Sequence, residues 1–197
     1  MDEDGDMELP IPNGKWLKTN YVGGHLKNYD SMLVLSHFKG HPMGGFGGAL
    51  KNIMALAVGI SDGAGYGDNT KAMLMTRGIT EMARLGVALG GRKETFTGLA
   101  GVGDLIVTCT SMHSRNRRCG ILLGQGKEIH EAMQEVGAVV EGYYAAANAQ
   151  ALAEKAGVEM PIAQAAYEVL YQGRDVHAVI TDLMGRAKRS ELDESWS

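Results

Sequence analysis

The sequence is poor in cysteine and in long apolar runs. Its 197 residues include two cysteines, Cys109 and Cys119, whose spacing matches neither a metal-binding pattern nor a disulfide framework. We therefore expect buried thiols in a reducing, cytoplasmic environment. No apolar run approaches the roughly 20 residues that cross a bilayer. The acidic residues 2–4 are unlike the basic start of a signal peptide, so we expect neither a membrane protein nor an exported one.

The sequence also lacks an excess of positive charge. It has 19 basic and 23 acidic residues, for a net charge of -4. No global positive field therefore draws the chain to nucleic acid or to anionic lipid, and any anion site must be local. The length and the 45% share of hydrophobic residues allow one well-buried core.

Proline is scarce and unevenly placed, which divides the chain in two. Three of the four prolines lie in residues 1–47, together with the glycine-rich run 44–48. We expect an irregular segment here, with one strand at the apolar run 31–35. From residue 49 onward alanine, methionine and leucine recur at helical spacing. This spacing predicts a mainly α fold. We expect a helical bundle over residues 48–184 and a polar tail over residues 185–197.

The helical pattern can be placed more closely. Ser114 is suited to cap a helix start, Pro161 to a first turn, and Gly157 and Gly173 to helix ends. The predicted helices cover residues 49–61, 69–89, 101–110, 114–123, 129–136, 142–156, 162–171 and 176–184.

Lys51 is the first candidate for chemistry. With Asn52 it opens a helix that is otherwise apolar. Burial there would disfavour the ammonium form and bring the amine into a range useful for proton transfer. The alternative is a lysine at a helix terminus that keeps its charge in water.

A basic run, residues 114–118 (SRNRR), is the candidate anion site. Ser114 and Arg115 stand at a helix start, where unpaired amides favour an anion and a guanidinium adds a bidentate donor. The alternatives are a solvated basic face or a nucleic-acid patch. The patch is poorly supported, because aromatic residues are not interleaved and the chain is acidic.

Two acidic residues stand in turns between predicted helices. Asp104 ends the glycine-rich run 98–104 (GLAGVGD), which does not have the G-x-G-x-x-G order of a dinucleotide fingerprint. Glu141 lies between two predicted helices. Each could cap a helix or contact a ligand, and capping is the default for Glu141. His37 and His41 have no third ligand at a matching spacing, so we predict no metal site.

Several motifs, taken together and in order, resemble the C-terminal domain of bacterial NAD(P)-dependent glycerol-3-phosphate dehydrogenases. The resemblance covers residues 48–184. It is carried by GALKN (48–52), GLAGVGDL (98–105), CTS (109–111), SRNRR (114–118) and VVEG (139–142).

This resemblance implies an enzyme that transfers hydride reversibly between sn-glycerol 3-phosphate or dihydroxyacetone phosphate and NAD or NADP, for glycerophospholipid synthesis. It implies that Lys51 is the general acid/base, and that Asp104, Ser114, Arg115 and Asn116 bind substrate. By the same resemblance, Arg115, Val139 and Glu141 meet the cofactor. A phosphate-bearing small molecule is the expected partner, and a homodimer is possible.

The sequence departs from that family upstream of Lys51. Only 50 residues precede this lysine, without a strand-initiated G-x-G-x-x-G, so we expect no Rossmann domain. Residues 5–52 instead resemble an uncharacterised domain often found beside iron–sulfur ferredoxin modules. A natural fusion or a misassembled reading frame would explain the junction. Two other functions stay open, a non-catalytic helical binding or dimerisation module and a redox-associated accessory protein.

Overall fold

The computed structural model describes residues 6–10, 19–23 and 44–186, with side chains from residue 48 onward. Contacts within the chain divide it into two units, Met1–Phe38 and Lys39–Ser197. In the first unit, strands β1 (Asp6–Pro10) and β2 (Thr19–Gly23) pair antiparallel, with Asp6 opposite Gly23.

This hairpin corrects the expectation of a single strand in residues 1–47. The predicted strand at residues 31–35 lies outside the described residues. The missed signal is the alternation of polar and apolar residues from Asp6 to Leu9, which is the period of a strand. The strand expected at residues 31–35 was predicted from a compact apolar run, and an alternating segment contains no such run.

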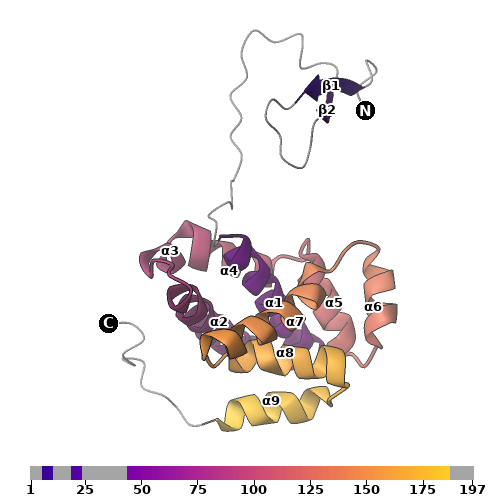
Figure 1. The fold of residues 1–197 in the computed structure, drawn as a ribbon. Helices are drawn as coiled ribbons and strands as arrows, with labels where there is room; N and C mark the ends of the chain where they lie inside the picture. Colours follow the sequence, from indigo (N-terminus) through magenta and orange to yellow (C-terminus); the bar gives the residue numbers. More distant parts are fainter. Residues whose placement is uncertain (1–5, 11–18, 24–43, 187–197) are drawn as a thin grey trace. The chain divides into compact units, whose positions relative to one another are not determined.

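The second unit is helical (Figure 1). Its elements are α1 (Gly44–Gly63), α2 (Asp68–Ala88), α3 (Glu94–Thr97), the π-helix η2 (Leu99–Gly103), α4 (Asp104–Thr110), α5 (Arg115–Gly124), α6 (Ile129–Val136), α7 (Glu141–Ala156), α8 (Pro161–Gln172) and α9 (Val176–Gly185). The helical fold class is thus confirmed. None of the described helices is long and apolar enough to cross a membrane.

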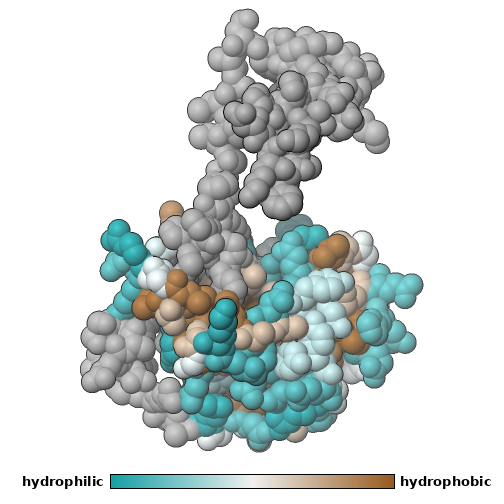
Figure 2. Space-filling model, viewed as in Figure 1, coloured by the Kyte–Doolittle hydropathy of each residue, from teal (hydrophilic) through white to brown (hydrophobic). Residues whose placement is uncertain are grey.

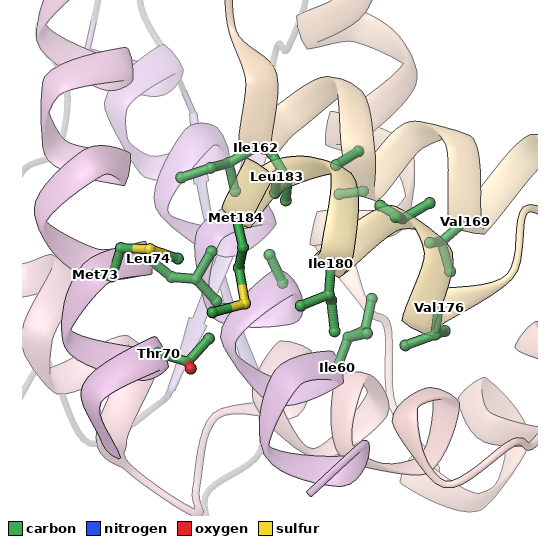
Figure 3. A pocket seen from close by; sticks show the side chains of 14 residues that line it. Ile60, Thr70, Met73, Leu74, Ile162, Val169, Val176, Ile180, Leu183 and Met184 are labelled. Carbon is green, nitrogen blue, oxygen red and sulfur yellow. The ribbon is translucent and has the colours of Figure 1, made fainter. Parts of the chain in front are cut away.

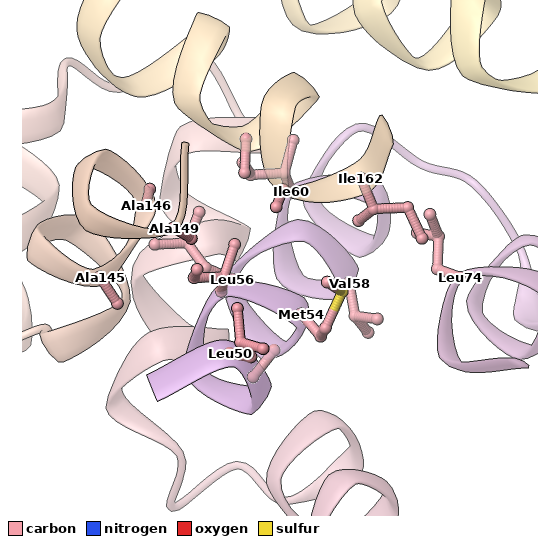
Figure 4. Close-up of a cluster of buried hydrophobic side chains, with 14 of the residues drawn as sticks. Leu50, Met54, Leu56, Val58, Ile60, Leu74, Ala145, Ala146, Ala149 and Ile162 are labelled. Atoms are coloured by element: carbon pink, nitrogen blue, oxygen red, sulfur yellow. The ribbon is translucent and has the colours of Figure 1, made fainter. Parts of the chain in front are cut away.

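Helix α1 is the centre of this unit and packs against α2, α4, α5, α7 and α8. Every residue from 50 to 56 is buried, which is the pattern of a helix that is covered on all sides. Leu50, Met54 and Leu56 are in the middle of the core cluster (Figure 4). Because Lys51 and Asn52 belong to this helix, the core holds them in place.

Four glycines bring α1 and α5 unusually close together. A Cβ atom at Gly59 would lie 2.2 Å from the Arg117 carbonyl oxygen, and one at Gly120 would lie 2.2 Å from the Leu56 oxygen. Gly63 and Gly124 repeat the contact one turn along. The two backbones therefore touch without intervening side chains, which fixes the start of α5 relative to α1.

The predicted helix ends are largely confirmed. The Ser114 hydroxyl accepts a hydrogen bond from the Arg117 amide, and Pro161 is the first residue of α8. Gly157 and Gly173 end α7 and α8 with φ angles of 65° and 63°, in the left-handed region that glycine adopts without strain.

Three details of the helix prediction were wrong. The glycine-rich run 44–48 belongs to α1, because extending an established helix adds a hydrogen bond for each residue fixed and outweighs the low propensity of glycine. The expected helix 101–110 begins as the π-helix η2 and becomes α-helical at Asp104. The short helix α3 was not expected.

A buried carboxylate on α2 caps the start of α8. Glu81 accepts hydrogen bonds from the amides of Ile162 (2.8 Å) and Ala163 (3.3 Å), two of the donors that a helix start leaves unpaired. Burial raises the pKa of Glu81 to about 7, although both amide bonds favour the carboxylate.

This raised pKa makes stability depend on pH. The folded state binds the Glu81 proton more tightly than the unfolded state, so the stabilisation is complete below about pH 4.5 and is lost as the pH rises to about 7. We expect the free energy of unfolding to fall by roughly 3 kcal/mol across that window. Glu81→Gln should remove most of this fall, and the exposed Glu131→Gln should not. Urea unfolding between pH 4.5 and 8 measures it, and equal slopes in all three proteins would contradict the prediction.

Candidate functional site

The site residues gather where the starts of α4, α5 and α7 meet α1. Lys51 of α1 is 7% exposed and forms an ion pair with Asp104, the first residue of α4. Asp104 therefore does not cap its helix. The preceding Gly103 occupies the cap position without a side-chain bond. The Thr108 hydroxyl donates to the Asp104 carbonyl oxygen at 2.6 Å.

The next residue of α1 reaches α7. The Asn52 side-chain amide donates a hydrogen bond of 2.7 Å to the Glu141 carboxylate. Glu141 is the first residue of α7, but Val140 occupies the cap position, so the default expectation that Glu141 caps this helix was wrong. Asn52 was quoted beside Lys51 in the sequence but given no role. Its signal was a polar residue at the buried start of an apolar helix.

Asn116 joins α5 to the same cluster. It is buried, and its side-chain oxygen accepts a hydrogen bond of 2.8 Å from the Gly142 amide. A Cβ atom at Gly142 would lie 2.7 Å from the Asn52 carbonyl oxygen and 3.0 Å from the Asn116 side-chain oxygen. The start of α7 is thus held against Asn52 and Asn116 together.

Arg115 points outward from the same helix start. Its side chain is exposed and makes no hydrogen bond or ion pair with another described residue, so its guanidinium is available to a ligand. Ser114 occupies the cap position with its side chain. Val139, two residues before Glu141, is 61% exposed. All seven residues selected from the sequence therefore belong to this part of the fold.

The basic run 114–118 is not a uniform solvated face. The guanidinium of Arg117 is buried and donates to the Asp62 carboxylate at 2.6 Å, and Lys71 lies 3.1 Å from the same carboxylate. Arg115 and Arg118 are exposed. The alternative of an all-solvated basic face is therefore wrong for Arg117.

The two cysteines do not take part in this chemistry. Both are buried, as expected. Burial raises the pKa of Cys109 to about 12 and that of Cys119 to about 11, so both remain neutral thiols near pH 7.

An apolar cavity lies elsewhere, between α1, α2, α8 and α9 (Figure 3). None of the candidate site residues lines it, and its volume of about 30 Å³ is too small for a metabolite. Its lining is almost entirely aliphatic, from Ile60 and Leu74 to Ile180 and Met184. It is a packing defect rather than a site.

A model of the C-terminal region of NAD-dependent glycerol-3-phosphate dehydrogenases matches residues 44–181. The chain belongs to this family. A glycerol-3-phosphate dehydrogenase [NAD(P)+] of Geobacillus kaustophilus is 58% identical over 148 residues, which is 75% of this chain and 43% of the relative. One from Clostridium perfringens is 60% identical over 145 residues, which is 74% of this chain and 44% of the relative.

Solved structures of this family have the same fold. The glycerol-3-phosphate dehydrogenase of Coxiella burnetii matches with a TM-score of 0.70 and 46% identity, over 71% of this chain and 43% of that one. The yeast enzyme matches with a TM-score of 0.65 and 30% identity, over 71% and 41% of the two chains. The chain therefore spans less than half the length of these relatives.

Proposed function

We propose that this chain supplies the substrate-binding and proton-transfer part of an NAD(P)-dependent glycerol-3-phosphate dehydrogenase. The observation that carries the proposal is the ion pair between the buried Lys51 and the partly buried Asp104, set beside the start of α5 where Arg115 is exposed. The reaction interconverts sn-glycerol 3-phosphate and dihydroxyacetone phosphate.

Lys51 is the general acid and base of this reaction. Reduction of a ketone needs a proton at oxygen as hydride reaches carbon, and the ammonium group of Lys51 delivers it. In the reverse direction the neutral amine takes the proton from the substrate hydroxyl. Asp104 holds the lysine in place through the ion pair. Core burial of α1 keeps this geometry rigid.

The phosphate group is bound at the start of α5. The helix-start amides favour an anion there, and Arg115 adds a forked pair of donors that matches phosphate oxygens. Ser114 and Asn116 contribute to substrate binding on either side of Arg115. Since the Asn116 oxygen already accepts from Gly142, its side-chain amide group is the part that donates to substrate.

When bound, NADH or NADPH would supply the hydride, and NAD+ or NADP+ would accept it in the reverse direction. Arg115, Val139 and Glu141 are the residues of this chain that would contact this cofactor. These residues fit contact with one side of the cofactor. Val139 has exposed apolar surface, and the Glu141 carboxylate has a second oxygen besides the one that accepts from Asn52. The described residues contain no glycine-rich phosphate cradle between a strand and a helix.

Apolar side chains are exposed around the site. Leu99 (89%) precedes Asp104 in η2, and Val107 (63%) follows it on α4. Figure 2 shows apolar residues of this kind among polar ones on one face of the helical unit. We assign this surface to contact with the nucleotide-binding part of a complete dehydrogenase, and we retain a homodimer as a further proposal.

Replacing Arg115 tests the phosphate site. We expect Arg115→Lys to weaken binding of glycerol 3-phosphate about tenfold, because lysine cannot form the bidentate contact. Isothermal titration calorimetry measures the dissociation constants. Arg118→Lys is the matched control on the same helix and should bind as the parent does. Equal affinities for the parent and Arg115→Lys would remove Arg115 from the site.

A further inference from the structure

A close contact around Phe96 precedes the candidate site in the chain. A Cβ atom at Gly101 of η2 would lie 2.1 Å from the Phe96 carbonyl oxygen. One at Gly86 of α2 would lie 2.1 Å from the tip of the Phe96 ring. Phe96 is partly buried against the core. Phe96 therefore has the surface of α2 on one side and the backbone of η2 on the other.

The π-helix η2 leads into α4 without a break. Gly103 has helical φ and ψ angles of -62° and -47°, and Asp104 follows with -66° and -35°. A displacement at Gly101 is therefore transmitted to Asp104, because no loop between them absorbs it. Single π-helical turns are frequent at functional sites.

We propose that Phe96, seated between Gly86 and Gly101, is a positioning residue that sets the place of Asp104 against Lys51. Its importance for catalysis depends on the proposed function of Lys51. It acts through backbone contact with η2 and touches neither substrate nor cofactor. A misplacement of about 1 Å at a catalytic pair costs an enzyme about a hundredfold in rate, so such a contact is a determinant of activity.

Chemical labelling of Lys51 tests this in the full chain. Acetylation with isotope-coded acetic anhydride at pH 8, read by mass spectrometry, compares Lys51 with the exposed Lys155 in the same molecule. Asp104→Asn is the reference variant and should raise relative labelling of Lys51 about tenfold, because it removes the adjacent negative charge. We expect Gly101→Ala to raise it severalfold, since the new methyl group meets a backbone oxygen.

Gly98→Ala is the matched control. It lies in the same glycine-rich run, its φ of -93° suits any residue, and its Cβ atom would lie 3.9 Å from its nearest neighbour. Labelling of Lys51 in this variant should equal that of the parent. Circular dichroism confirms that each variant keeps its helices.

A second variant covers the case in which Gly101→Ala does not fold. Phe96→Ala removes the ring without adding an atom to the backbone, and it should also raise labelling of Lys51. Parent-like labelling of Lys51 in Phe96→Ala, with Asp104→Asn raised, overturns the proposal, as does a lack of effect in Asp104→Asn itself. These outcomes are independent of the proposed function, because labelling reports the ion pair whether or not Lys51 transfers a proton.

Discussion

The purified chain should reduce dihydroxyacetone phosphate with NADH or NADPH about 10⁵-fold more slowly than the roughly 10 s⁻¹ of a typical enzyme. Hydride transfer requires the nicotinamide carbon within about 3–3.5 Å of the substrate carbon. Among the described residues, we propose that Arg115, Val139 and Glu141 contact a dinucleotide from one side, and these residues include no glycine-rich cradle for its phosphates. Orientation of this kind accounts for roughly 7 kcal/mol or more of a reaction barrier, so its loss outweighs an intact lysine.

The measurement follows NADH and NADPH absorbance in the parent, in Lys51→Ala and in Lys155→Ala. Lys155 is an exposed lysine near the end of α7 and controls for the loss of a positive charge. Turnover near 10 s⁻¹ that disappears only in Lys51→Ala would contradict the prediction. It would mean that residues 1–47 or a partner subunit position the cofactor.

The helical unit was predictable because its signals are local. The helix positions follow from the spacing of apolar residues, from capping residues at helix starts and from glycines at helix ends. All of these signals lie within a few residues of the element they define. The candidate site residues were selected because their motifs are contiguous in sequence and their order matches a known family. Their meeting in space was implied by the resemblance and follows from tertiary packing, in which Lys51 reaches Asp104 and Asn116 reaches Gly142.

What the sequence did not reveal depends on contacts between distant residues. Nothing in the neighbourhood of Glu81 shows that its carboxylate caps α8, because Glu81 and Ile162 are 81 residues apart in the sequence. In the sequence Arg117 looks like its basic neighbours. Its burial follows from the ion pair with Asp62 of α1, which the basic run does not indicate. Local patterns cannot predict such pairs, because whether a charged side chain is buried depends on a partner residue that is distant in the sequence.

The glycine contact between α1 and α5 is the feature on which the geometry of the site depends most. The Lys51–Asp104 pair belongs to α1 and α4, and the helix start that we propose as the phosphate site belongs to α5. The distance between the two halves of the site is therefore set by Gly59, Gly63, Gly120 and Gly124. Any side chain placed there must push the helices apart, because the atoms it meets are backbone atoms of a fully packed helix.

We expect Gly120→Ala to lower the free energy of unfolding by about 3 kcal/mol, as overpacking a filled interface does. The change also raises helix propensity by about 1 kcal/mol. A lower free energy of unfolding therefore shows that the packing effect is the larger, and a higher one shows that propensity is. Affinity for glycerol 3-phosphate should fall at least about tenfold, because Arg115 moves away from Lys51 with the start of α5. Urea unfolding and calorimetric titration measure the two effects.

Gly185→Ala is the control for Gly120→Ala. It is also a helical glycine, at the end of α9, but a Cβ atom there would have no neighbour within 4 Å. It should leave stability unchanged or slightly raised and should leave binding unaffected. If Gly120→Ala were as stable as Gly185→Ala, the close approach of α1 and α5 would not exist in solution. If it were destabilised yet bound glycerol 3-phosphate as the parent does, the spacing of these helices would be a matter of stability alone, and Arg115 would not work together with Lys51.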